Sequence, residues 1–168
     1  MEFTITQEFP ARLDRLWTAF GTREYATRKY LAMGATTVSI GRFQSSADAI
    51  EVELERDLPI TGSVALPSWA RKAIGRTQTL RHRTHWQRVD ASHVAARLEI
   101  TPVGLPVRAH GVGTIAESTG GSTRMVLNWR VDSMLGSKVE RLFADRIRAA
   151  LDDDHRFTLR YLAQAPSG

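Results

Sequence analysis

The 168-residue sequence contains no cysteine and no long run of apolar residues. The absence of cysteine excludes disulfide bonds and thiolate chemistry, and it fits a reducing compartment. A membrane-spanning helix needs roughly 20 consecutive apolar residues, and none of the apolar runs approaches that length. Residues 1–4 have the pattern of a strand and lack the basic and apolar regions of a signal peptide. We therefore expect a cytoplasmic protein without stable membrane insertion.

Lysine is also scarce, because only Lys29, Lys72 and Lys138 occur and every other positive residue is an arginine. The formal net charge is +5, and a basic balance of this kind can mark a nucleic-acid-binding protein. The arginines are spread along the whole chain, however, rather than gathered in one run. We interpret the surplus as a contribution to solubility and expect no nucleic-acid partner.

The first 34 residues predict a strand followed by two short helices. Residues 2–9 alternate between apolar and polar side chains, which is typical of a half-buried strand. Pro10 ends this strand and can open a helix over residues 11–20. Thr22 is a suitable cap for a second helix, which Gly34 ends.

From residue 35 to about 131 the apolar residues recur with a period of two. This pattern predicts six strands, with a turn at residues 41–46 and short polar links between the later strands. Short links imply antiparallel neighbours, and the one-sided alternation implies that one face of the sheet is covered. The strands are expected around residues 38–40 and over 48–56, 78–89, 93–100, 107–117 and 123–131.

Residues 58–76 interrupt this pattern, because Pro59, Gly62 and Pro67 exclude a continuous strand. Residues 67–74 fit two helical turns that end at Gly75. A long insertion with its own apolar residues is either a lid over a cavity or a connector packed on the core. The sequence leaves both open; the apolar residues concerned are Val64, Leu66, Trp69 and Ile74.

The chain closes with a long helix over residues 137–162, where Ser137 and Glu140 have the spacing of a capping box. Apolar residues recur behind it at helical spacing, and no glycine or proline intervenes before Pro166. Such a helix is about 40 Å long and needs a large apolar surface to lie on. The preceding strands supply that surface, so the sequence predicts one α+β domain over residues 1–168.

Several pieces of this pattern resemble the START-like superfamily, also called SRPBCC, and most of all a bacterial family of unknown function within it. The pieces are Phe9-Pro10 before Leu16-Trp17, Asp57-Leu58-Pro59, Trp86, Gly111-Val112-Gly113, and residues 135–140 at the start of the last helix. The resemblance implies a helix-grip fold, in which a strongly curved antiparallel sheet of about seven strands wraps around the long C-terminal helix. Two short helices follow the first strand in that fold.

The resemblance also implies a cavity between sheet and helix that holds a hydrophobic or amphipathic molecule such as a lipid, polyketide or isoprenoid. The residues agree, because small side chains at inward positions, including Ala109 and Gly111, leave room beside large ones. We take Tyr25 and Trp17 as ordinary core residues. The candidate ligand-binding residues are His82, Thr84, Trp86, Ala109, Gly111, Trp129, Phe143, Arg146, Asp154, Trp69 and Tyr30.

Three of these candidates carry polar chemistry. His82 is either an acid or base that acts on a ligand or a histidine hydrogen-bonded within the core. Arg146 and Asp154 interrupt the apolar stripe of the last helix. In one interpretation both residues fix a polar group of the ligand. In the other, Arg146 reaches out to solvent and Asp154 pairs with a nearby basic side chain.

Three functions remain compatible with this pattern. The first is binding or transport of the hydrophobic molecule. The second is a cyclase, aromatase or hydrolase in the same cavity with His82 as its acid or base. The third is a protein-interaction module, like the chaperone-activating members of the superfamily, that uses a basic outer face at Arg81 and Arg83. We expect no cofactor and no metal site, since His82 and His85 face opposite sides of a strand, and we leave open a homodimer.

Overall fold

The computed structural model describes residues 1–60 and 68–164, which form a sheet, a long helix and three shorter ones. The strands pair in the order β1-β7-β6-β5-β4-β3-β2, and every pair is antiparallel. In chain order the elements are β1 (Glu2–Phe9), α1 (Leu13–Phe20), α2 (Arg23–Ala32), β2 (Thr37–Ser45), β3 (Ala49–Pro59), α3 (Ser68–Ile74), β4 (Thr77–Asp90), β5 (His93–Pro102), β6 (Val107–Glu117), β7 (Thr123–Ser133) and α4 (Ser137–Gln164).

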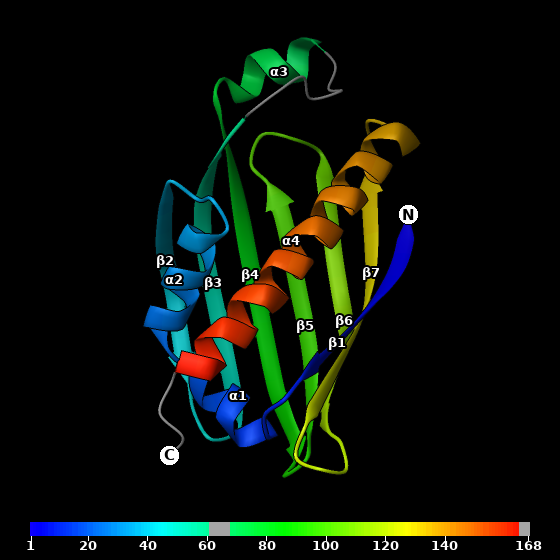
Figure 1. Cartoon of the computed structure of the whole chain (residues 1–168). Helices are drawn as coiled ribbons and strands as arrows, with labels where there is room; N and C mark the ends of the chain where they lie inside the picture. The colour runs from blue at the N-terminus through cyan, green and yellow to red at the C-terminus, as the bar shows by residue number, and fades with distance from the viewer. Residues whose placement is uncertain (61–67, 165–168) are drawn as a thin grey trace.

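Helix α4 runs diagonally across the concave face of the sheet, while α2 lies over β2 and β3 and α1 lies at the end of the molecule opposite α3 (Figure 1). The buried residues of α4 recur at helical spacing along the predicted stripe, and they are Val139, Ala144, Ile147, Leu151, Phe157, Thr158 and Leu162. The predicted α+β helix-grip architecture is therefore confirmed. No helix in the described ranges is long and apolar enough to span a membrane.

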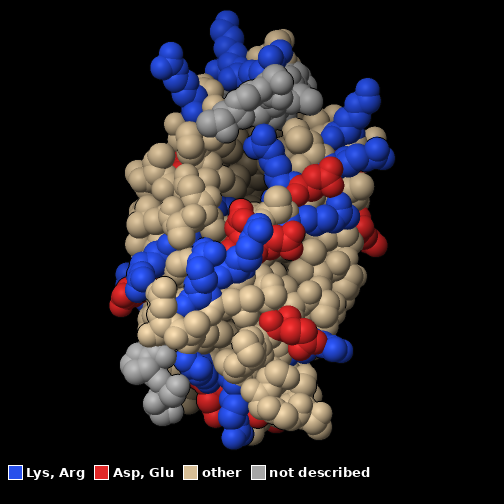
Figure 2. Space-filling model, in the orientation of Figure 1, with Lys and Arg blue, Asp and Glu red and all other residues tan. Residues whose placement is uncertain are grey.

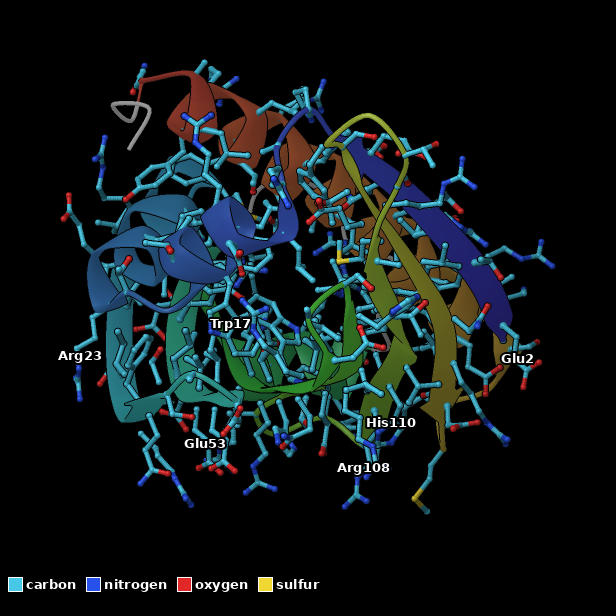
Figure 3. All side chains as sticks on the ribbon, turned by 90° about the horizontal axis from the view of Figure 1, so that it is seen from below. Glu2, Trp17, Arg23, Glu53, Arg108 and His110 are labelled. Carbon is cyan, nitrogen blue, oxygen red and sulfur yellow. The ribbon has the colours of Figure 1, made fainter. Side chains whose placement is uncertain are left out.

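The outer face of the sheet carries cross-strand ion pairs. Arg81 lies 2.7 Å from Glu55, and Arg83 lies 3.7 Å from Glu53 in the register that pairs these residues across β3 and β4. Glu53 points away from the trough of the sheet that α4 and the α1–α2 pair close (Figure 3). The basic residues of this face are thus partly neutralised by the alternating glutamates of β3.

The turn expected at residues 41–46 is wrong. Strand β2 continues to Ser45, and its register shifts between Ile40 and Arg42, so that Gly41 sits in a β-bulge. The hairpin turns later, where the Ser46 hydroxyl accepts the amide hydrogens of Asp48 and Ala49. A glycine within a strand often marks a bulge rather than a turn.

The capping box expected at the start of α4 is also wrong. The carboxylate of Glu140 accepts the amide hydrogen of Ser133 at 3.1 Å, and the described residues offer no hydrogen bond to the Ser137 hydroxyl. Gly136, at φ +94°, makes the turn, and its carbonyl accepts the amides of Val139 and Glu140. Glu140 therefore ties α4 to the end of β7 instead of capping its own helix.

Helical turns predicted after Pro67 are present as α3, and Gly75 follows at φ +66°. Trp69 on this helix is 52% exposed. Val64 and Leu66, which the lid interpretation invoked, lie outside the described residues, as does the side chain of Ile74. Both interpretations of this segment, a lid over the cavity and a connector packed on the core, therefore stay predictions.

Candidate functional site

Two adjoining chambers lie between the sheet and α4. The first, which we call the polar chamber, has a volume of about 80 Å³, and the second, the apolar chamber, about 120 Å³. Both are lined by Arg56, Ile100, Ile147 and Ala150, so these residues form the boundary between them. The surface is hollowed between α4 and the α3 end of the sheet (Figure 2).

The polar chamber is built by β3, β4, α2 and the C-terminal half of α4, which together bring titratable side chains into the core. Its aromatic and aliphatic walls include Phe20, Trp86, Leu98 and Trp129. The polar residues among its lining are Tyr25, Lys29, Tyr30, Arg56, His82, Thr84, Glu99 and Asp154.

An ion pair joins α2 to α4 at this chamber. The Lys29 ammonium lies 2.9 Å from the Asp154 carboxylate, and the two side chains are 11% and 25% exposed. The ammonium also sits 4.7 Å from the ring centroid of Tyr30. One turn before Lys29, the phenol of Tyr25 is 2.5 Å from the Thr158 hydroxyl on α4. The alternative in which Asp154 pairs with a basic side chain is the one observed.

A second set of contacts surrounds His82. The Nε of Arg56 donates to Nε2 of His82 at 3.0 Å, and the Tyr30 hydroxyl lies 3.5 Å from Nδ1. Because a guanidinium only donates, Nε2 carries the lone pair and the ring proton is on Nδ1. Arg56 also packs on Tyr30, with 4.7 Å from its guanidinium carbon to the ring centroid.

The electrostatic setting of the cluster fixes its protonation states. Burial, followed by the positive charges of Arg56 and Lys29, lowers the pKa of His82 well below its usual value, so the ring is neutral at pH 7. Burial by itself lowers the pKa of Lys29, but Asp154 and the neighbouring tyrosines raise it by more, which leaves Lys29 charged. Burial raises the pKa of Tyr25, which stays a neutral phenol.

The apolar chamber lies closer to the α3 end of the molecule and is walled by β3, β4, β5, β6 and the first half of α4. Arg146 and Pro59 belong to its lining and are exposed, so they stand at its mouth. The other lining residues are Arg56, Leu58, Ile60, Gln78, Leu80, Ile100, Pro102, Val107, Ala109, Leu142, Phe143, Ile147 and Ala150.

Most of the candidate residues named from the sequence line these chambers. The polar chamber contains His82, Thr84, Trp86, Trp129, Asp154 and Tyr30. The apolar chamber contains Ala109, Phe143 and Arg146. Gly111 and Trp69 line neither one. Whether any of these residues contacts a ligand stays a prediction.

Gly111 and Gly113 serve close packing rather than open space. A Cβ at Gly111 would lie 2.7 Å from the indole of Trp129, and one at Gly113 would lie 1.8 Å from the carbonyl oxygen of Val126. The interpretation that Gly111 leaves room in the cavity is therefore wrong, because the Trp129 indole already occupies that space. Only Ala109 lines a chamber as expected.

Sequence reasoning missed Lys29 and Arg56, which carry the positive charge of the site. A signal existed for Arg56, because Ile50, Val52 and Leu54 alternate inward and Arg56 occupies the next inward position of the same strand. Lys29 follows Tyr25 by four residues and therefore lies on the same face of α2. Tyr25, assigned to the core, is buried as expected and also lines the polar chamber.

The arrangement is better suited to holding a polar group than to moving protons. The only lone pair of the neutral His82 ring is engaged by Arg56, so a role as base needs Arg56 to move away first. Catalysis by His82 thus stays a prediction. Within the described ranges, no group of three or more histidine or acidic side chains is placed to hold a metal ion.

Solved structures of similar fold are distant in sequence. A conserved protein from Geobacillus kaustophilus has a TM-score of 0.59 at 12% identity, over 98% of this chain and 96% of the other. Ara h 8.0201 has a TM-score of 0.58 at 9% identity, over 95% of this chain and 98% of the other. Dicamba monooxygenase has a TM-score of 0.57 at 13% identity, and the match covers 99% of this chain but 53% of the monooxygenase chain. These likenesses support the fold alone.

Sequence comparison supplies the family. No curated protein matches the chain. The profile of the family described as "Protein of unknown function (DUF2505)" matches residues 4–162, which include every strand from β2 to β7 and nearly all of α4. The chain therefore belongs to the DUF2505 family.

Proposed function

We propose that the protein binds a hydrophobic or amphipathic small molecule, of the lipid, polyketide or isoprenoid kind, in the chambers between the sheet and α4. The observation that carries the proposal is an apolar chamber with an exposed rim that adjoins a buried polar cluster. A mostly apolar interior with a few oriented polar groups is the usual form of a small-molecule site.

Membership of the START-like superfamily, which we also propose, fits this role. The dicamba monooxygenase of similar fold was solved bound to 3,6-dichlorosalicylic acid, a small organic molecule. Binding rather than catalysis is favoured by the cluster itself, since Arg56 occupies the acceptor nitrogen of His82.

The first experiment is native mass spectrometry of freshly purified protein, followed by denaturation and extraction of any released compound. We expect a bound apolar molecule. A ligand present at one hundred times its Kd stabilises the native state by about 2.7 kcal/mol, so a matching compound from a lipid and aromatic library should raise Tm by several degrees.

Two neighbouring alanines of α4 provide a matched pair of variants. Ala150 lines both chambers, whereas its neighbour Ala149 is exposed and lines neither. Ala150→Phe should fill the boundary between the chambers and abolish the ligand-dependent shift, whereas Ala149→Phe should retain it. The absence of any co-purified compound together with no shift across the library would refute the proposal.

A further inference from the structure

The charge balance of the two chambers bears on the chemistry of the ligand. Arg56 is only 4% exposed, and among the described residues its one side-chain hydrogen bond runs from Nε to the neutral ring of His82. Across residues 1–60 and 68–164, no carboxylate lies within ion-pair distance of Arg56. The described residues give the terminal guanidinium nitrogens of Arg56 no hydrogen-bond partner, and Arg56 lines both chambers, so these donors are available to a ligand.

The nearby carboxylate of Asp154 compensates this charge only in part, because it attracts Arg56 from beyond ion-pair distance. Asp154 is engaged by Lys29 at 2.9 Å, and Glu99, the other acidic residue of the lining, accepts a hydrogen bond from the Thr101 hydroxyl at 3.4 Å. Neither carboxylate is therefore paired with Arg56. His82 and Tyr25 are neutral there and add no negative charge. A buried cation that has no counterion in direct contact is costly, so an anion that enters the chamber gains a favourable partner there.

The apolar chamber shows the same imbalance. Arg56 and Arg146 are the only charged residues of its described lining, and both are positive. The indole N–H groups of Trp86 and Trp129, which line the polar chamber, are also buried without an acceptor among the described residues. The chambers therefore have donors in excess and are short of acceptors.

We propose that the ligand is an amphipathic carboxylic acid, whose carboxylate accepts hydrogen bonds from the Arg56 guanidinium while its hydrocarbon part fills the apolar chamber. This inference rests on the proposed small-molecule function and specifies the class of ligand. Arginine suits the role because its fork of N–H groups matches the two oxygens of a carboxylate. Arg146 at the mouth adds positive charge along the path of entry.

The test compares ligands that differ only in the head group. Octanoate, decanoate and dodecanoate are titrated into the full-length protein by calorimetry, beside the alcohols and methyl esters of the same chain lengths. Because a hydrogen bond to a charged group contributes more than a neutral one, we expect the best acid to bind roughly 10- to 100-fold more tightly than its alcohol or ester.

Three variants locate the effect. Arg56→Met should bring the acid down to the affinity of the alcohol and leave the alcohol unchanged, and Arg56→Lys should keep part of the preference. Arg83→Met is the control, because Arg83 lies on the outer face of the adjacent strand with Glu53 as partner. If Arg56→Met does not fold, the comparison of acid with ester in the unaltered protein still decides the question.

Each outcome bears on a different claim. Equal binding of acid, alcohol and ester overturns the carboxylate inference and leaves the small-molecule function standing. A preference for the acid that survives Arg56→Met overturns the assignment to Arg56. No binding by any member of the series, together with no co-purified compound, removes the proposed function and this inference with it.

Discussion

Asp154→Asn tests whether the buried ion pair with Lys29 stabilises the interior. The substitution keeps the size of the side chain but leaves Lys29, which is 11% exposed, beside Arg56 with no anion. Breaking one partner of a buried pair costs about 3 to 5 kcal/mol. Asp154 is 25% exposed, which favours the lower end, so we expect a loss of about 3 kcal/mol.

For a domain of this size, a loss of 1 kcal/mol lowers Tm by about 2 to 4 °C, so Asp154→Asn should melt roughly 6 to 12 °C below the wild type. Urea denaturation followed by circular dichroism measures the free energy of unfolding, and differential scanning calorimetry measures Tm. Asp145→Asn on the same helix is the matched control. Its pair with Arg148 is largely exposed and should contribute less than about 0.5 kcal/mol.

The double variant Lys29→Met/Asp154→Asn refines the test. Because it removes the uncompensated ammonium as well, we expect it to recover a large part of the stability that Asp154→Asn loses. Strictly additive losses would show that the two residues are not coupled. A Tm for Asp154→Asn no lower than that of Asp145→Asn would refute the argument that Lys29 depends on this carboxylate.

Two further predictions concern the same core. Since the pKa of His82 is lowered in the folded state, the unfolded chain binds the extra proton below pH 6.5, and wild-type stability should fall there by up to about 1.4 kcal/mol per pH unit. His82→Gln should show a shallower fall in urea titrations at stepped pH, with the exposed His85→Gln as control, and an unchanged slope would contradict the neutral assignment. Gly111→Ala should lower the free energy of unfolding by about 1 to 3 kcal/mol. Gly113→Ala should lower it by more, because the Val126 carbonyl cannot move aside as the Trp129 indole can. Equal denaturation midpoints for the two glycine variants would contradict this reasoning.

Periodicity was sufficient to predict the fold. Alternation in β3 and helical spacing in α4 are properties of consecutive residues, and both elements pack as those spacings require. Glycine was less informative. Gly41 was expected in a turn, yet it lies within β2 and allows a bulge, whereas Gly113 within β6 admits a neighbouring strand. Which role applies depends on a partner strand that the local sequence does not name.

The polar cluster was only partly predictable for the same reason. His82 and Asp154 were found because polar residues interrupt apolar patterns. Their partners were not identified, since Lys29 and Asp154 are far apart in the chain and meet only when α2 packs against α4. Arg56 was overlooked although it continues the inward alternation of Ile50, Val52 and Leu54. A charged residue that continues an inward alternation is thus a signal worth following.

The pairing of β1 with β7 has a consequence for how the chain folds. Phe9 lies opposite Thr123 and Glu2 opposite Arg130, so among the described residues the first strand pairs only with the last. During synthesis, the backbone groups of β1 stay without their sheet partner until β7, the last strand, has been made. Contacts between such distant segments slow folding, because a long loop has to close before they form. The trough that encloses both chambers is therefore expected to be completed late.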